Sequence, residues 1–205
     1  MVESLKASEK QATAALESRL KASPFAAWVD RSPGVGPKQA ARLLASLGDP
    51  AVIASSGAWA RQRDLYSYCG YGDAEKQVRR RGQQVSWNPD AKMRCHLIVE
   101  SCVKTLRAPC ERPDGQPWAI HRDGCRCSVY RVVYDEGREK YADAVHPAEC
   151  KRCGPAGRPA EAGSALSPGH QEARAYRLAC KAILRDLWRE ARRLHGFEDE
   201  EASWL

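Results

Sequence analysis

Residues 32–45 read SPGVGPKQAARLLA, a turn rich in glycine and proline that leads directly into a helical pattern. Glycine adopts backbone angles that other residues resist, so Gly34 and Gly36 favour a tight turn. Proline suits the first turn of a helix, where its missing N–H costs nothing, so Pro37 marks a helix start. The apolar residues that follow predict one packed helical face, made of Ala41, Leu44 and Ala45.

A second helical pattern precedes this turn, with Phe25, Trp28 and Val29 on one side, and Val35 would fill the space between the two helices. Free amides at a helix start, next to basic side chains, bind phosphate. This is the pattern of a helix-hairpin-helix, an element that binds the nucleic-acid backbone. The predicted DNA contacts are Gly34, Gly36, Lys38, Gln39, Arg42, Arg79, Arg80, Arg81 and Lys92. The alternative is a plain glycine turn between two core helices.

The chain has 205 residues and a formal net charge of +7, and its surplus of basic side chains is local. Residues 1–30 carry four basic and four acidic side chains, and residues 113–205 carry fifteen of each. Residues 31–112 carry fourteen basic and seven acidic side chains. This distribution is typical of a protein with a polyanionic partner, and we expect DNA. The alternative is the arginine surplus common in chains from GC-rich genomes.

The composition also bears on the compartment. No run of about 18 apolar residues is present, so the sequence predicts no membrane span and no membrane partner. The first residues, MVESLK, lack an apolar signal region, which predicts a cytoplasmic protein, in the bacterial host if the gene is a phage gene. Nine cysteines in a reducing compartment indicate metal binding or scattered burial rather than disulfides.

Hydrophobic spacing predicts helices and no alternating strand pattern, so we expect an all-α fold. Its core would be the helix-hairpin-helix, with a long C-terminal helix and irregular zinc-binding insertions. We expect five parts: an N-terminal helix at 1–24, the helix-hairpin-helix and basic helical region at 25–107, Cys/His-rich zinc-binding insertions with one helix at 108–166, the C-terminal helix at 167–197, and an acidic tail at 198–205.

Several helices have recognisable faces or start signals. Residues 3–29 are predicted helical, interrupted at Ser23-Pro24, with Leu5, Ala12, Leu16 and Leu20 on one side. Helices are also expected over 59–68 and 130–144. Asn88 and Pro89 predict a capped helix over 89–106. Its inward residues would be Met93, Leu97, Ile98 and Val103. Ser167-Pro168 begins the clearest amphipathic pattern, which runs to about Leu194.

Two groups of cysteine and histidine lie in the irregular segments, where a metal ion would contribute folding energy. The first group is Cys110, His121, Cys125 and Cys127, and the second is His146, Cys150, Cys153 and His170. The run CKRCGP at 150–155 is typical of a knuckle, in which neighbouring thiolates converge on one tetrahedral zinc. The spacing allows two structural zinc ions, or one ion shared by Cys125, Cys127, Cys150 and Cys153.

The remaining cysteines, Cys69, Cys95, Cys102 and Cys180, fall within helical patterns and are predicted to be small core residues. No catalytic set can be assembled from the sequence. It has no Gly-x-Ser-x-Gly elbow, phosphate-binding Lys loop or His-Glu-x-x-His motif. Ser86 is the one serine placed where a nucleophile could meet DNA, and no base is paired with it. We therefore expect a protein without enzymatic activity.

Residues 33–49, PGVGPKQAARLLASLGD, resemble the C-terminal helix-hairpin-helix domain of DEDD-type, Piv-like insertion-sequence transposases. The resemblance continues through LYSYCG at 65–70, NPDAKMR at 88–94 and the final helix, and covers about residues 25–195. The cysteine-rich segments look like insertions. The RNase H-like catalytic domain of the transposases has no counterpart in this sequence, and their serine after the glycine-turn helix has none before Arg79.

The chain is more closely similar to a group of actinobacteriophage proteins. The shared stretches are KQAAR at 38–42, WN at 87–88, AKMR at 91–94, ESCVK at 100–104, YRVVY at 130–134, CGPAG at 153–157 and GH at 169–170. Some members look like recombination directionality factors, which bind a large serine integrase and switch it from insertion to excision. The resemblance thus implies a non-catalytic accessory protein of phage DNA recombination with a serine integrase as partner.

Two other functions stay open. The chain could be a DNA-binding helix-hairpin-helix module derived from a transposase C-terminal domain, with the glycine turn on phosphates. It could instead be a transposase-type enzyme that uses Ser86 or a set of carboxylates. On the directionality-factor interpretation, the final helix or the zinc-binding segments would contact the integrase.

Overall fold

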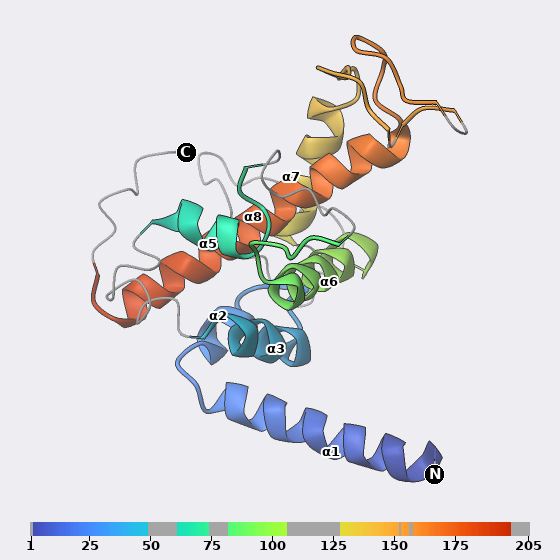
Figure 1. The fold of residues 1–205 in the computed structure, drawn as a ribbon. Coiled ribbons are helices and arrows are strands. Elements are labelled where there is room, and N and C mark those ends of the chain that lie inside the picture. Colours follow the sequence, from blue (N-terminus) through green and yellow to red (C-terminus); the bar gives the residue numbers. More distant parts are fainter. Residues whose placement is uncertain are drawn as a thin grey trace.

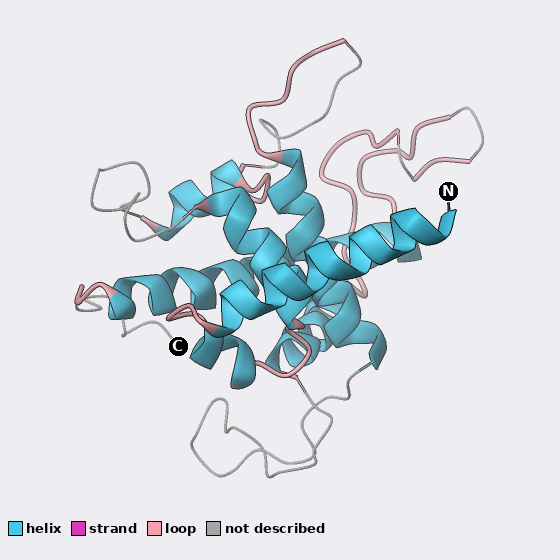
Figure 2. Ribbon diagram, turned by 90° about the horizontal axis from the view of Figure 1, so that it is seen from below, coloured by secondary structure: helices cyan, strands magenta, loops and turns pink. Residues whose placement is uncertain are grey.

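The computed structural model describes the chain in several stretches, and the structural statements below concern these residues: 2–48, 61–73, 82–105, 128–151, 153–155 and 158–197. All named secondary-structure elements in this part of the chain are helices, which confirms the all-α prediction (Figure 2). They are α1 (Val2–Lys21), α2 (Ala26–Asp30), α3 (Pro37–Leu47), α5 (Gln62–Tyr68), α6 (Pro89–Thr105), α7 (Val129–Lys140) and α8 (Pro168–Leu194).

The long helix α8 organises the fold (Figure 1). Helices α5, α6 and α7 all pack against it, α3 packs on α6, and α1 packs on α3. The buried stripe of α8 is apolar, with Ile183, Leu184 and Leu187 fully shielded from solvent. Its contact with α7 is close at Gly137, where an added Cβ would lie only 3.0 Å from the Cα of Ala175.

The predicted helix start at Ser167 is confirmed. The Ser167 hydroxyl accepts a hydrogen bond from the backbone N–H of His170, and Pro168 occupies the first turn. Serine is a favoured cap because its oxygen satisfies an amide that has no partner within the helix. The helix then runs to Leu194, as the amphipathic pattern predicts.

The predicted turn between two helices is present, from Arg31 to Gly36. Val35 is buried between the elements, as expected. Only Gly34 needs the left-handed region, with φ of 91°, because Gly36 is extended with φ of −70°. The expectation of unusual backbone angles at both glycines is therefore wrong for Gly36.

The packed face of α3 differs from the predicted one. Ala45 is exposed and Leu44 only partly buried, whereas Ala40, Ala41, Leu43 and Leu47 are buried. The buried face of α3 differs from the predicted one because two helices, α6 and α1, pack against α3. Helix spacing alone gives the period of such a face but not its width.

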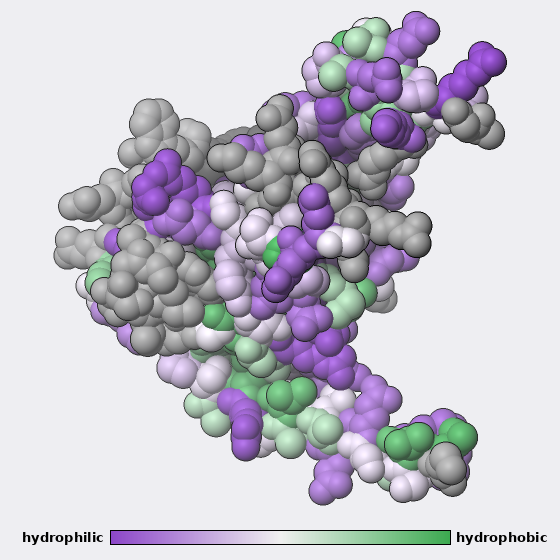
Figure 3. Space-filling model, viewed as in Figure 1, coloured by the Kyte–Doolittle hydropathy of each residue, from purple (hydrophilic) through white to green (hydrophobic). Residues whose placement is uncertain are grey.

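The first predicted helix is two helices, separated at the expected Ser23-Pro24 break. Leu20 is buried and Leu16 packs against the core, but Leu5 is 65% exposed, contrary to the predicted stripe. Figure 3 shows hydrophobic side chains gathered in the lower part of the view, where α1 runs below α2 and α3. The N-terminal end of α1 extends past α3 (Figure 1), which accounts for the exposure of Leu5 in the first turns of this helix.

Helix α6 begins where predicted, at the Asn88 cap. Ile98 is buried, but Met93 is 43% exposed, so its prediction as an inward residue is wrong. The buried face instead contains Cys95, Val99 and Cys102. These two cysteines, with Cys69 and Cys180, are buried free thiols, which confirms them as core residues. Burial raises the pKa of Cys69 to about 12.

The expected helices over 59–68 and 130–144 are found as the shorter α5 and α7, and residues 59 and 60 lie outside the described part. Helix α7 buries Tyr130 and Tyr134, and Val133 and Tyr141 are partly buried beside them. None of the helices in the described stretches has the length and apolar character needed to cross a bilayer.

Candidate metal centre

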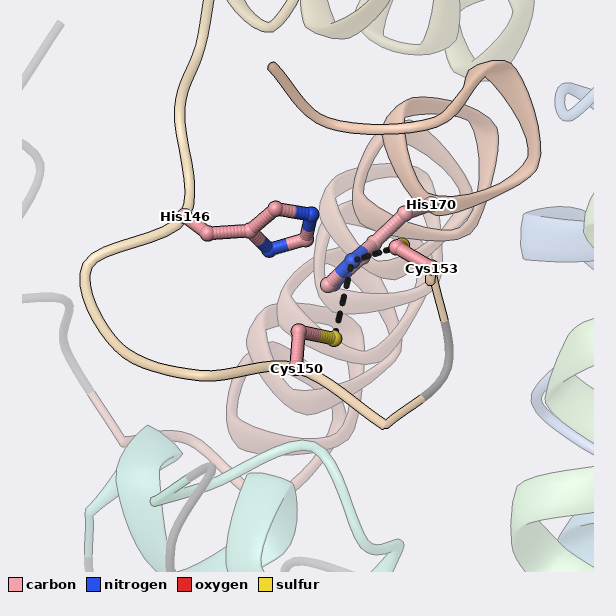
Figure 4. Close-up of side chains that lie close together, drawn as sticks. All are labelled: His146, Cys150, Cys153 and His170. Atoms are coloured by element: carbon pink, nitrogen blue, oxygen red, sulfur yellow. Dashed lines mark hydrogen bonds between the residues drawn. The ribbon is translucent and has the colours of Figure 1, made fainter. Parts of the chain in front are cut away.

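Four side chains converge at the N-terminal end of α8: His146, Cys150, Cys153 and His170 (Figure 4). One ligand atom from each lies within 4.8 Å of all the others. The Nδ1 atom of His170 is 3.1 Å from the Sγ of Cys153 and 3.9 Å from the Sγ of Cys150. Such a group of two thiols and two imidazoles could hold a metal ion.

The loop between α7 and α8 brings three of these residues together. Its two arms run antiparallel, and isolated bridges pair Val145 with Ala165 and Cys150 with Ala160. The backbone N–H of His146 donates to the carbonyl of Ser164 at 2.8 Å. One bridge contains Cys150, and the other contains Val145, the neighbour of His146. Backbone pairing in the loop therefore positions both candidate ligands.

The two cysteines of the run predicted as a knuckle, Cys150 and Cys153, lie in a turn. The backbone N–H of Cys153 donates to the carbonyl of Cys150 at 3.5 Å, which turns both thiols to the same side. Gly154 is required by space, because a Cβ there would lie 1.7 Å from the carbonyl oxygen of Arg158. The close return of the chain at Arg158 thus explains the glycine after the second cysteine.

The first turn of α8 carries the fourth candidate ligand. His170 is oriented by the Ser167 cap, and the Ser167 hydroxyl also lies 3.1 Å from the Sγ of Cys153. This hydroxyl can donate to a thiolate, and hydrogen bonds of this kind orient metal ligands and tune their affinity. Sequence reasoning missed this role of Ser167, although a serine three residues before a candidate ligand at a helix start was the available signal.

The surroundings of His146 favour a metal ligand over a core histidine. Its side chain is 2% exposed, and its Nε2 atom is buried without a hydrogen-bond partner among the described residues. A buried polar atom left without a partner costs about 1–3 kcal/mol, which a metal bond would remove. The imidazole also lies next to that of His170, with ring centroids 5.3 Å apart and the rings tilted by 45°.

The second predicted ligand group is therefore brought together in full. Cys150 and Cys153 are completed by His146 and His170, so this set needs no contribution from elsewhere in the chain. The first group, Cys110, His121, Cys125 and Cys127, lies outside the described residues. The alternative of one site shared with Cys125 and Cys127 falls on those residues too.

Comparison with protein-family models, curated proteins and solved structures gave no match. The resemblance to transposases and to phage directionality factors therefore stays a prediction from the sequence.

The predicted DNA contacts near the turn lie at the start of α3. Lys38 is partly buried, and its Nζ atom is 3.4 Å from Glu9 Oε1 on α1. Gln39 is partly buried and its Oε1 has no hydrogen-bond partner in the described structure. Gly34 and Arg42 are partly buried and Gly36 is exposed. An acidic residue beside Lys38 weakens the case for a phosphate there.

The other predicted DNA contacts lie elsewhere. Lys92, on α6, sits over the rings of Trp87 and Tyr71, with its Nζ 5.1 Å and 5.7 Å from the two centroids. This packing gives Lys92 a structural role in the turn after α5. Arg79, Arg80 and Arg81 lie outside the described residues.

Proposed function

We propose that the protein is a zinc-stabilised, non-catalytic accessory factor of DNA recombination that binds a serine integrase and promotes excision. The observation that carries this proposal is the four-ligand cluster at the start of α8. Zinc sites filled by four protein ligands are structural, whereas catalytic sites keep one position for water or substrate. The cluster therefore supports a metal-ordered binding platform.

Zinc fits the cluster better than other common ions. Two thiols with two imidazoles is a usual donor set for structural zinc, and hard cations such as Mg²⁺ prefer oxygen. Bonds of about 2.0–2.3 Å in a tetrahedron place ligand atoms about 3.3–3.8 Å apart. The two distances from His170 Nδ1 to the thiols, 3.1 Å and 3.9 Å, are close to these values.

The recombination function is inferred from the sequence resemblance. The position of the cluster indicates which surface binds the partner. The loop stands at one end of α8, beyond α7 and far from α1 (Figure 1). On this proposal a zinc-ordered loop and the start of α8 contact the integrase. Buried free thiols such as Cys95 and Cys180 favour a reducing compartment, the host cytoplasm.

An in vitro recombination assay with the cognate serine integrase tests the function. Addition of the full-length protein should stimulate recombination of the excision substrate and inhibit that of the insertion substrate. The double variant C150S/C153S should lose this effect, and C69S, which alters a buried thiol away from the cluster, should keep it. No change of direction with the wild-type protein would exclude the proposal.

Metal analysis of the purified protein tests the cofactor separately. We expect at least one zinc per chain, and one fewer in C150S/C153S than in the wild type. A wild-type protein with no bound metal, prepared without chelators, would contradict the zinc assignment.

The second candidate function is a DNA-binding module without an integrase partner. The local charge surplus of residues 31–112 favours it. Binding of duplex DNA in the absence of integrase, together with no effect on recombination direction, would support this candidate over the first.

A further inference from the structure

Helix α8 separates its charges by side. Six basic residues form what we call the basic stripe: Arg174, Arg177, Lys181, Arg185, Arg189 and Arg192. A residue turns a helix by roughly 100°, so spacings of three and four keep these side chains on one side. All six are partly exposed. Of the acidic residues of α8, Glu172 and Glu190 fall on the other side of the helix, and Asp186 lies next to Arg185.

Most of the stripe has no acidic partner in the described structure. Arg185 pairs with its neighbour Asp186 at 3.0 Å. No carboxylate of the described residues forms an ion pair with Arg177, Lys181 or Arg189. Burial and the nearby Arg177 charge lower the pKa of Lys181, because these like charges are close and not neutralised. An anionic ligand would relieve this repulsion.

Aromatic rings hold several of these cations in place. Lys181 Nζ lies 5.3 Å from the ring centroid of Tyr66 on α5, and the Arg174 guanidinium lies 5.4 Å from that of Tyr141. Arg177 donates to the Gly72 carbonyl at 2.8 Å. Cation–π contacts leave the charge available while they limit side-chain freedom, so less entropy is lost on binding.

We propose that the basic stripe binds the phosphate backbone of double-stranded DNA. Its six cations span about 27 Å along a straight helix, which equals roughly eight base pairs. Five of them are arginines, whose forked guanidinium matches phosphate geometry. A regular row of cations fits a regular row of phosphates better than the uneven surface of an acidic protein. This inference rests on the proposed function, in which the protein acts at DNA, but moves the contact from the glycine turn to α8.

Fluorescence anisotropy with a labelled 30-base-pair duplex, without integrase, tests the proposal over a series of salt concentrations. The stripe variant K181Q/R185Q/R189Q should lose at least tenfold in affinity at low salt. Its slope of log affinity against log salt should fall by roughly two to three, about one per lost phosphate contact. The matched control K6Q/K10Q/R19Q removes three charges from α1, which packs on α3, and should lose less than threefold.

Two further variants separate charge from folding. R185K/R189K keeps the charge and should keep most of the affinity. R189Q alone removes a side chain that forms no hydrogen bond or ion pair with described residues, and should lower the slope by about one. Equal losses in the stripe and α1 variants, or wild-type affinity in the stripe variant, would overturn the proposal. So would an unchanged duplex affinity together with lost binding of a poly-glutamate peptide, which would indicate a protein partner.

The DNA-binding measurement and the recombination assay test separate claims, so one claim can be overturned while the other stands. A stripe variant that binds DNA normally while the wild type still redirects the integrase overturns the α8 surface alone. A wild type that binds DNA through the stripe but leaves recombination unchanged overturns the integrase partnership alone.

Discussion

Arg31 and Glu190, which are 159 residues apart in the sequence, form an ion pair between the end of α2 and the C-terminal part of α8. The Glu190 carboxylate is 4% exposed and also accepts hydrogen bonds from Arg193 at 2.7 Å and 3.0 Å. A buried carboxylate between two guanidinium groups thus ties the start of the glycine turn to the central helix.

Loss of the Glu190 charge should therefore destabilise the fold. We expect E190Q to lower the free energy of unfolding by about 1–3 kcal/mol, since the buried side chain at position 190 loses its charge-assisted hydrogen bonds while Arg31 and Arg193 keep access to water. Urea denaturation followed by circular dichroism measures this. E100Q is the matched control, because the exposed pair of Glu100 with Lys104 should contribute less than about 0.5 kcal/mol.

The same carboxylate predicts a dependence on pH. Hydrogen bonds from Arg193, followed by the charge of Arg31, lower the pKa of Glu190 below its ordinary value of 4.5. Its contribution is complete above that value and is lost as the pH falls through the lower folded-state pKa. The stability difference between wild type and E190Q should therefore shrink as the pH falls below about 4.5. A difference that stays constant down to pH 2 would contradict this assignment, and thermal melts at each pH provide the measurement.

The sequence groups the four candidate metal ligands correctly because the signal is local. His146, Cys150 and Cys153 lie within eight residues of one another, and His170 follows a helix start marked by serine and proline. Short spacing in the sequence limits how far apart these side chains can lie, so the sequence alone is enough to group them. By contrast, a partner such as Glu190 for Arg31 depends on how distant helices pack, which no local pattern specifies.

The predicted helix faces are limited in the same way, because a local pattern does not specify how distant helices pack. The amphipathic pattern places α8 correctly from end to end, since its many large apolar residues fix one side. On α6 the sequence predicted both Met93 and Cys95 to be buried. The structure buries the cysteine and leaves Met93 43% exposed, since small side chains allow α6 to approach α8. The basic stripe follows from helical spacing, but its aromatic neighbours Tyr66 and Tyr141 lie on α5 and at the C-terminal cap of α7, which no local pattern specifies.

Both polar atoms of the Asn88 side-chain amide, Oδ1 and Nδ2, should stabilise the fold. Its Oδ1 accepts from the amides of Asp90 and Ala91, and its Nδ2 donates to Ser46 and to Tyr68. N88A should cost about 2 kcal/mol, of which the helix cap accounts for about 1. N88D keeps the cap and loses the two donated bonds, so it should cost about half as much in thermal denaturation. Equal losses in both variants would show that the cap contributes nothing.

The space at Gly154 gives a test of the knuckle. G154A would bring a methyl group to within 1.7 Å of the Arg158 carbonyl, so the turn must open and the two thiols must separate. We expect at least a hundredfold loss of zinc affinity, measured by competition with a chelator. G169A is the control, because a Cβ there meets nothing within 4 Å and the residue lies in the first turn of α8. A G154A protein with wild-type zinc affinity would exclude the knuckle geometry.

The Ser167 hydroxyl connects the start of α8 with the candidate metal site through one oxygen atom. As a cap it accepts from the N–H of His170, and as a donor it can bond the Sγ of Cys153 at 3.1 Å. S167A should therefore lower zinc affinity about 10- to 100-fold. It should also cost about 1 kcal/mol of stability. S167D keeps a good cap but places a negative charge beside a thiolate, so it should restore stability in the metal-free protein without restoring zinc affinity. If zinc affinity followed stability in both variants, the hydroxyl would act on the helix alone and not on the ligand.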